Sequence, residues 1–272
     1  MSSEPAVGQP FRARRAIARG LRLLRRNSLL CGLLLAVTGT LVFAAAGILT
    51  AVLIDASNGE QVTVVVGPAT AWVVAVIGLG AMLLIGLGHT LASHAAAQDL
   101  RKERVGMASA WSACWRHWLP VTAILAVVFV LAGVGGIVLV VPGLAVLTVF
   151  ALAAPARVID GMPLSKTFEH SVRTAAAGGW GLARYLLAAS VLVFLLLFGA
   201  NWAVGELQTA ILMNQLSAEN PAPRIEATTI VLMVLQLLLV TFAPFLFGVI
   251  SAAAYAELKA GSGDQALSSV FD

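Results

Sequence analysis

The chain has 272 residues, of which 60% are hydrophobic and only 11% are charged. Soluble domains carry about a quarter of their residues as charges, so this composition excludes an ordinary soluble fold. The net charge of +4 would suit a nucleic-acid-binding protein, but the cations flank long apolar runs, where they set membrane orientation and attract anionic lipid. We therefore expect an all-helical membrane protein with no nucleic-acid partner.

Long apolar runs predict six membrane-spanning helices. A helix needs roughly 20 apolar residues to cross the hydrocarbon. The third and fourth spans share one run, which Gly133-Val-Gly-Gly136 and Pro142-Gly143 divide into a hairpin. The predicted spans are 29–54, 68–96, 119–138, 142–158, 185–208 and 228–256.

The basic residues predict the orientation of these spans. Sixteen of the seventeen Lys and Arg residues fall on one side of the six-span arrangement, and only Arg224 falls on the other. Cytoplasmic loops are enriched in Lys and Arg, so both termini are expected in the cytoplasm of a bacterial plasma (inner) membrane. The expected organisation is a basic amphipathic segment at 1–27, a membrane domain at 28–258 and a short tail at 259–272.

Three cytoplasmic segments carry apolar residues at helical spacing, backed by basic or polar side chains. This pattern predicts amphipathic helices that lie in the membrane interface. The stripes are Ala13, Ile17, Leu21 and Leu24; Ala108, Trp111, Trp115 and Trp118; and Leu164, Phe168, Val172 and Ala175. Each segment would lead into two spans, so a threefold hairpin repeat is one hypothesis and six unrelated helices are the other.

The second half of the chain resembles a broad bacterial family. The likeness lies in Pro142-Gly-Leu-Ala-Val, in Pro155-Ala-Arg-Val-Ile-Asp160-Gly-Met-Pro163, in residues 165–171 and in Tyr255-Ala-Glu-Leu-Lys259. That family comprises six-helix membrane proteins related to the membrane domain found beside some glycerophosphodiester phosphodiesterases. The resemblance implies a fold and a membrane location. It implies no catalytic residue, because the family's biochemical role is largely unassigned.

The common catalytic signatures are missing from the sequence. It contains no His-Glu-x-x-His, no Gly-x-Ser-x-Gly, no phosphate-binding Gly-rich Lys loop and no Cys-x-x-Cys. These patterns mark metal, nucleophile and nucleotide sites, so we expect no enzyme activity, no cofactor and no bound metal. Cys31 and Cys114 fall near the reducing cytoplasmic side, where free thiols are expected.

The first functional hypothesis is a non-catalytic scaffold or accessory subunit. It would bind anionic membrane lipid, a partner membrane protein or a second copy of itself through its basic cytoplasmic face. Glu169 and Arg173 are four residues apart on a predicted helix. The alternative to lipid or partner binding at these two residues is therefore a surface ion pair. The candidate contact residues are Arg12, Arg14, Arg15, Arg19, Arg22, Arg101, Lys102, Arg104, Lys166 and Arg173.

The alternative hypothesis is a secondary transporter or permease component for a small or amphiphilic solute. Its path would use His89, Asn201, Glu206, Gln236 and Pro244, because polar groups at membrane depth often mark a substrate route. Each residue also has a structural interpretation. The histidine would meet water or a neighbouring helix, the carboxylate would be solvated at a helix end, the two amides would bond each other, and the proline would bend its helix.

Overall fold

The computed structural model describes residues 11–26, 68–103, 106–138, 140–199, 202–207, 209–210 and 227–271. Every regular element within these ranges is helical. The elements are α1 (Ala13–Arg26), α3 (Pro68–Leu100), α4 (Met107–Val138), α5 (Val140–Phe150), α6 (Ala153–Ile159), α7 (Leu164–Ala177), α8 (Gly179–Phe194), the π-helical turn η1 (Leu195–Gly199) and α10 (Ala227–Phe271).

Five helical stretches among the described residues are long and apolar enough to cross a membrane. They are Leu79–Leu100, Ala108–Gly135, Val140–Ile159, Gly179–Leu207 and Phe242–Gly261. They coincide with the second to sixth predicted spans, and their length and composition indicate a membrane protein. The first predicted span, 29–54, lies outside the described residues.

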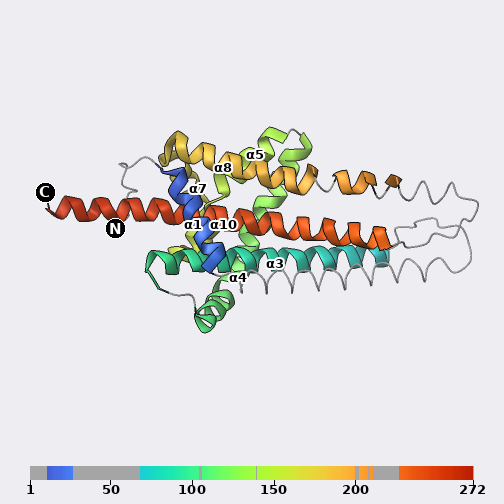
Figure 1. Cartoon of the computed structure of the whole chain (residues 1–272), viewed down its shortest axis with the longest axis horizontal. Coiled ribbons are helices and arrows are strands. Elements are labelled where there is room, and N and C mark those ends of the chain that lie inside the picture. Colours follow the sequence, from blue (N-terminus) through green and yellow to red (C-terminus); the bar gives the residue numbers. More distant parts are fainter. Residues whose placement is uncertain are drawn as a thin grey trace, which may run out of the picture.

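The helix α1 crosses the other helices, whereas α3, α8 and α10 run along the long axis of the molecule (Figure 1). It contacts α10 through Ala16, Gly20 and Leu23, all of which are buried. A Cβ at Gly20 would lie 3.6 Å from the Cβ of Ala253, so the two helix backbones approach closely. Small residues permit this approach, which suits a protein whose helices gain no hydrophobic advantage from leaving lipid.

The packed face of α1 differs from its predicted apolar stripe. Ile17 and Leu21 of that stripe are 51% and 63% exposed, and the helix docks on Ala16 and Gly20 instead. A stripe that lies in the membrane interface faces away from the protein, so these two side chains are free to contact lipid. Close packing of small residues then attaches the opposite face of α1 to the bundle.

The second predicted interfacial helix is not a separate element. The predicted segment around Trp111 and Trp115 and the predicted span 119–138 form one continuous helix, α4, which passes through Pro120. A proline removes one intrahelical hydrogen bond, and packing of neighbouring helices offsets that loss. The indoles of Trp111 and Trp115 stack with centroids 6.1 Å apart and are 70% and 75% exposed.

Two further boundaries differ from prediction. The fourth span, predicted as one helix over 142–158, consists of α5 and α6 joined at Ala151 and Leu152, which are both buried. The expected short tail at 259–272 begins inside α10, which continues as a helix to Phe271. Pro142 lies in the first turn of α5, a position that needs no intrahelical N–H bond.

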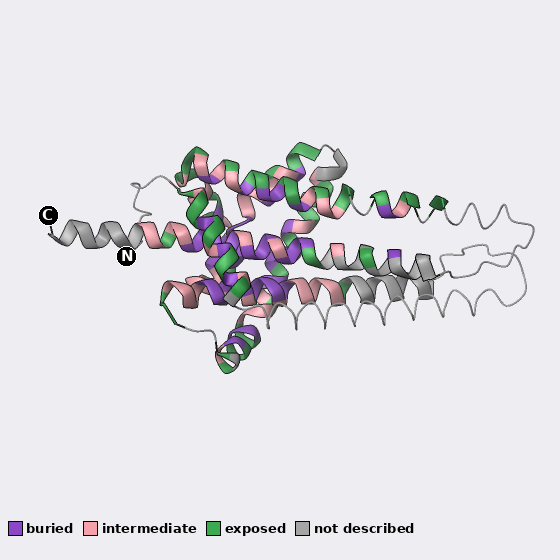
Figure 2. Cartoon of the chain, in the orientation of Figure 1, coloured by how far each residue is buried: buried purple, intermediate pink, exposed green. Residues whose placement is uncertain are grey.

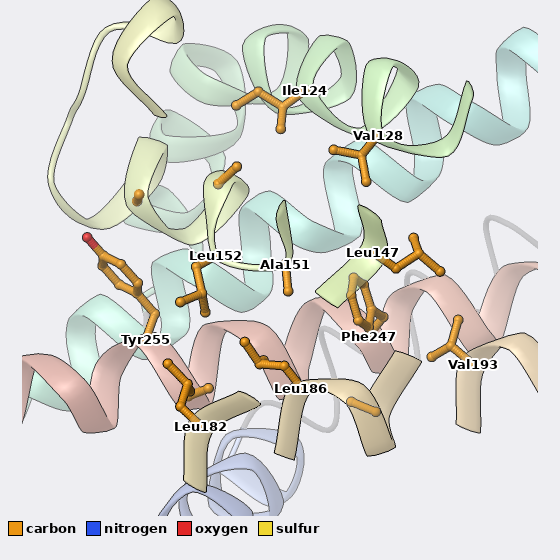
Figure 3. Packing of buried hydrophobic residues seen from close by; sticks show 14 of the residues in the cluster. Ile124, Val128, Leu147, Ala151, Leu152, Leu182, Leu186, Val193, Phe247 and Tyr255 are labelled. Carbon is orange, nitrogen blue, oxygen red and sulfur yellow. The ribbon is translucent and has the colours of Figure 1, made fainter. Parts of the chain in front are cut away.

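The hydrophobic core lies where α5, α6, α8 and α10 meet α4. Figure 3 shows Ala151 between Leu152 and Leu147, with Leu186 of α8 and Phe247 of α10 packed next to them. The buried residues concentrate in the middle of the helix bundle (Figure 2). By contrast, large apolar side chains such as Val130 of α4 are exposed, as expected for a surface that contacts lipid.

Glycines allow three pairs of helices to approach closely. A Cβ at Gly86 of α3 would overlap Thr122 of α4, and one at Gly248 of α10 would lie 2.9 Å from the ring of His89. A Cβ at Gly135 of α4 would lie 2.9 Å from a backbone nitrogen of α5. The small residues of the predicted spans therefore do serve close helix packing.

Candidate functional site

A polar network joins the α6–α7 turn to α10. Asp160 ends α6, and Gly161, with φ of 65°, adopts the left-handed conformation that turns the chain toward α7. The hydroxyl of Tyr255 donates a hydrogen bond to Asp160 Oδ2. Lys259 Nζ lies 3.1 Å from Asp160 Oδ1, and His170 Nε2 lies 2.9 Å from the hydroxyl oxygen of Tyr255. Three elements thus meet on one carboxylate and one phenol.

The direction of these hydrogen bonds follows from the number of available protons. Tyr255 has a single hydroxyl proton and gives it to Asp160, which as a carboxylate only accepts. His170 must therefore donate its Nε2–H to the Tyr255 oxygen. Burial lowers the pKa of His170 below its ordinary value; the charge of Asp160 opposes this effect and that of Lys259 adds to it. The imidazole consequently favours its neutral form.

We predict a pH dependence of folding stability that arises at His170. The unfolded chain protonates this histidine near its ordinary pKa of 6.5, whereas the folded chain does so only at lower pH. The stability contribution is therefore complete above pH 6.5 and declines as the pH falls below it. A His170→Gln variant should show a shallower loss of melting temperature between neutral and acidic pH, measured by thermal unfolding in detergent. Identical pH profiles would contradict this assignment, because the other histidines are present in both proteins.

The residues of this network all lie in the runs that carry the family resemblance. Those runs are 155–163 for Asp160, 165–171 for His170, and 255–259 for Tyr255 and Lys259. The sequence predicts no role for Tyr255, because nothing in it indicates that this residue lies next to the α6–α7 turn. The observed bonds connect helices and present no activated nucleophile, so this network is best described as a helix-docking site.

A second polar contact fastens α1 to the bundle. Arg19 Nε lies 3.5 Å from Asp99 Oδ2 of α3, and Arg19 Nη2 lies 3.8 Å from Glu257 Oε2 of α10. The three side chains are 17%, 8% and 11% exposed, respectively. Arg19 is also one of the predicted lipid or partner contacts, and in the structure its guanidinium faces two carboxylates of the bundle. Ion pairs this far from water are retained where both charges have partners.

The other predicted contact cations are exposed wherever the structure describes them. Glu169 Oε1 and Arg173 Nη2 are 2.6 Å apart, which confirms the predicted surface ion pair. Lys102 has a positive φ of 59° and lies just beyond the end of α3. Arg104 lies outside the described residues. The exposed cations are Arg12, Arg14, Arg15 and Arg22 on α1, Arg101 and Lys102 after α3, and Lys166 and Arg173 on α7.

The predicted transport residues are joined in one place only, within the described structure. His89 Nε2 donates to the backbone carbonyl of Pro244 at 2.8 Å, and both residues are buried between α3 and α10. This contact matches the structural interpretation of a histidine that meets a neighbouring helix. Glu206 is exposed near the end of its span. Asn201 and the side chain of Gln236 are outside the described part of the chain.

Comparison with known proteins gives no relative for this chain. No family model, no curated protein and no solved structure matches it. Within the described residues, no group of three or more His, Cys, Asp or Glu side chains could hold a metal ion, and Cys114 is a buried free thiol. Function must therefore be argued from the helix-docking site, the cations and the exposed surface.

Proposed function

We propose that this protein is a multi-pass scaffold or accessory subunit of a bacterial plasma membrane, with six spans, both ends in the cytoplasm and no catalytic activity of its own. It binds anionic lipid through its basic cytoplasmic face and holds a partner membrane protein or a second copy there. One observation carries the proposal. The helix α1 is attached by its small and ion-paired face and presents Arg14, Arg15 and Arg22 outward, together with Ile17 and Leu21.

The outward surface of α1 has the composition of a helix in the membrane interface. Arg14, Arg15 and Arg22 are exposed there, together with Ile17 and Leu21. Apolar side chains beside cations let such a helix insert shallowly while its charges meet lipid phosphates. Each cation near an anionic leaflet contributes about 1 kcal/mol of attraction.

Other features support the same orientation. The helix α7 and the end of α3 carry further exposed cations, and both lie at the end of the molecule that α1 crosses (Figure 1). The exposed indole of Trp180 lies under the guanidinium of Arg184, whose central carbon is 5.9 Å from the ring centroid. Tryptophan and arginine together favour the boundary between hydrocarbon and water.

Removing three outward arginines tests the proposal. The variant carries Arg14→Gln, Arg15→Gln and Arg22→Gln, and its matched control carries Lys at the same positions. Loss of three cations should weaken retention of anionic lipid on the order of a hundredfold at low salt, whereas the Lys control should bind like the parent. Native mass spectrometry of gently extracted protein measures retained lipid and co-purifying protein together.

Equal retention of anionic lipid by the parent, the Gln variant and the Lys control would contradict the proposal. A reporter on each terminus must accompany the measurement, because the same cations orient the chain. The transporter hypothesis makes a different prediction, namely a stoichiometric non-lipid solute in the same spectra. We add no second function, since the described residues bring no transport candidates together beyond His89 and Pro244.

A further inference from the structure

Four buried polar atoms without a protein hydrogen-bond partner occur at one end of α3. They come from α3, α4 and α6, which pack against one another. None belongs to the Asp160–Tyr255 network or to the Arg19 contacts. The atoms are His94 Nε2, Gln98 Oε1, His117 Nδ1 and Arg157 Nε.

These four residues are neighbours. His94 and Gln98 are one turn apart on α3 and therefore share a face. His117 of α4 lies close enough to both His94 and Arg157 for their charges to interact. Each of the four side chains is half-buried, so each also reaches the molecular surface.

The surroundings of the cluster are cationic. The charged groups that act on His117 are Arg157, Arg116 and His94, and the one that acts on His94 is Arg101. Two acids are near these residues in sequence: Asp99, which lies 3.5 Å from Arg19, and Asp160, which lies 3.1 Å from Lys259. In the described part of the chain, no carboxylate forms an ion pair with Arg157, whose Nη1 donates to the carbonyl of Met162.

A partly buried guanidinium without a carboxylate requires an anion or water to satisfy it. The four residues offer the donors that an oxyanion needs. The unpartnered Nε–H of Arg157 is a donor, each neutral imidazole donates through one of its two nitrogens, and the amide of Gln98 carries an NH₂ group beside its unpartnered oxygen.

We propose that the junction of α3, α4 and α6 binds a phosphate group. The phosphate belongs either to a lipid headgroup or to a free inorganic anion, and both sources present the same oxygens. The lipid form of this inference rests on the proposed function, since it makes the junction a specific headgroup site beside the general attraction of α1. The inorganic form does not depend on the proposed function.

The test measures thermal unfolding of delipidated protein with two probes, namely inorganic phosphate and phosphatidic acid. Sodium chloride at matched ionic strength is the reference. Phosphate-bearing probes should raise the melting temperature beyond the chloride reference. Because charge-assisted hydrogen bonds are the stronger kind, Arg157→Gln should weaken the apparent affinity about tenfold or more. Thr209→Val removes an exposed hydroxyl outside the cluster and outside the basic face, and it should leave the affinity unchanged.

A second variant is needed because Arg157→Gln also removes the hydrogen bond from Arg157 to the carbonyl of Met162, and loss of that bond affects folding. His117→Leu leaves Arg157 and its bond in place and replaces the imidazole of the cluster by an apolar side chain, so it should weaken binding as well. Stabilisation by phosphatidic acid alone supports the headgroup form, and stabilisation by inorganic phosphate supports the free anion. Parent protein that responds to neither probe beyond chloride, or variants that bind as the parent does, would overturn the inference.

Different results would reject the lipid-binding proposal for α1 and the phosphate site at the junction. The Gln triple variant of α1 keeps all four residues of the junction, so it should retain the phosphate-induced shift even when it loses surface lipid. Loss of the shift in that variant, with the shift intact in Arg157→Gln, would place the phosphate on α1 and reject the junction.

Discussion

An Arg19→Gln variant should release α1 from the bundle and lower the free energy of unfolding by about 3 kcal/mol. The change leaves Asp99 and Glu257 in a largely buried position without the guanidinium that lies between them. Removing one partner of a buried ion pair is costly, because the remaining charges stay desolvated. We place the effect at the lower end of the usual range, since the two separations of 3.5 and 3.8 Å are long for ion pairs.

Hydrogen exchange over residues 13–26, together with thermal unfolding, measures both parts of this effect. Arg22→Gln is the matched control, because Arg22 lies on the same helix and is exposed. Glu257→Gln in the Arg19→Gln background should restore part of the lost stability, because it removes one of the two carboxylates that lose the guanidinium. Unchanged exchange of α1 in Arg19→Gln would show that small-residue packing alone holds the helix in place.

Gly86→Ala should destabilise the protein by about 3 kcal/mol, the upper end of the cost of overpacking. The added Cβ would overlap Thr122 Oγ1 and lie 2.8 Å from the Cβ and 3.0 Å from the Cα of Thr122. Rotation of Thr122 moves only its hydroxyl and methyl groups, so α3 and α4 would have to separate. Thermal unfolding in detergent measures the loss.

Gly80→Ala is the control for this prediction. Gly80 lies on the same helix, and a Cβ there meets nothing within 4 Å. Alanine favours the helix by up to about 1 kcal/mol over glycine, so this variant should be neutral or slightly stabilised. Equal melting temperatures for the two variants would mean that α3 and α4 do not approach as closely as the structure shows.

Much of the helical architecture follows from the sequence because apolar length is a local property. The five spans within the described residues overlap spans predicted from four apolar runs, one of which is divided into a hairpin. The ends of the helices were less predictable. Pro120 lies at the start of the predicted span 119–138, but it is inside the observed helix α4. The continuation of α10 past Lys259 was also missed, because polar residues were interpreted as a tail although they can extend a helix into water.

The polar contacts were beyond sequence reasoning for a different reason. Arg19 and Glu257 lie at opposite ends of the chain, and nothing local to either residue indicates that α1 crosses α10. Arg19 instead resembled the other arginines of a basic helix. His89 gave a partial signal, since a histidine inside an apolar run requires a partner, but the carbonyl of Pro244 could not be identified as that partner from spacing alone.

The length of α10 has a mechanical consequence. Its 45 residues extend for about 67 Å, whereas the hydrocarbon of a bilayer is about 30 Å thick. This one helix is therefore about twice as long as a bilayer crossing requires. It carries Glu257 for α1, Tyr255 and Lys259 for the α6–α7 turn, and Pro244 for α3. A force that tilts the C-terminal end of α10 would act on all three attachments at once. The helices that contact α10 would therefore move together.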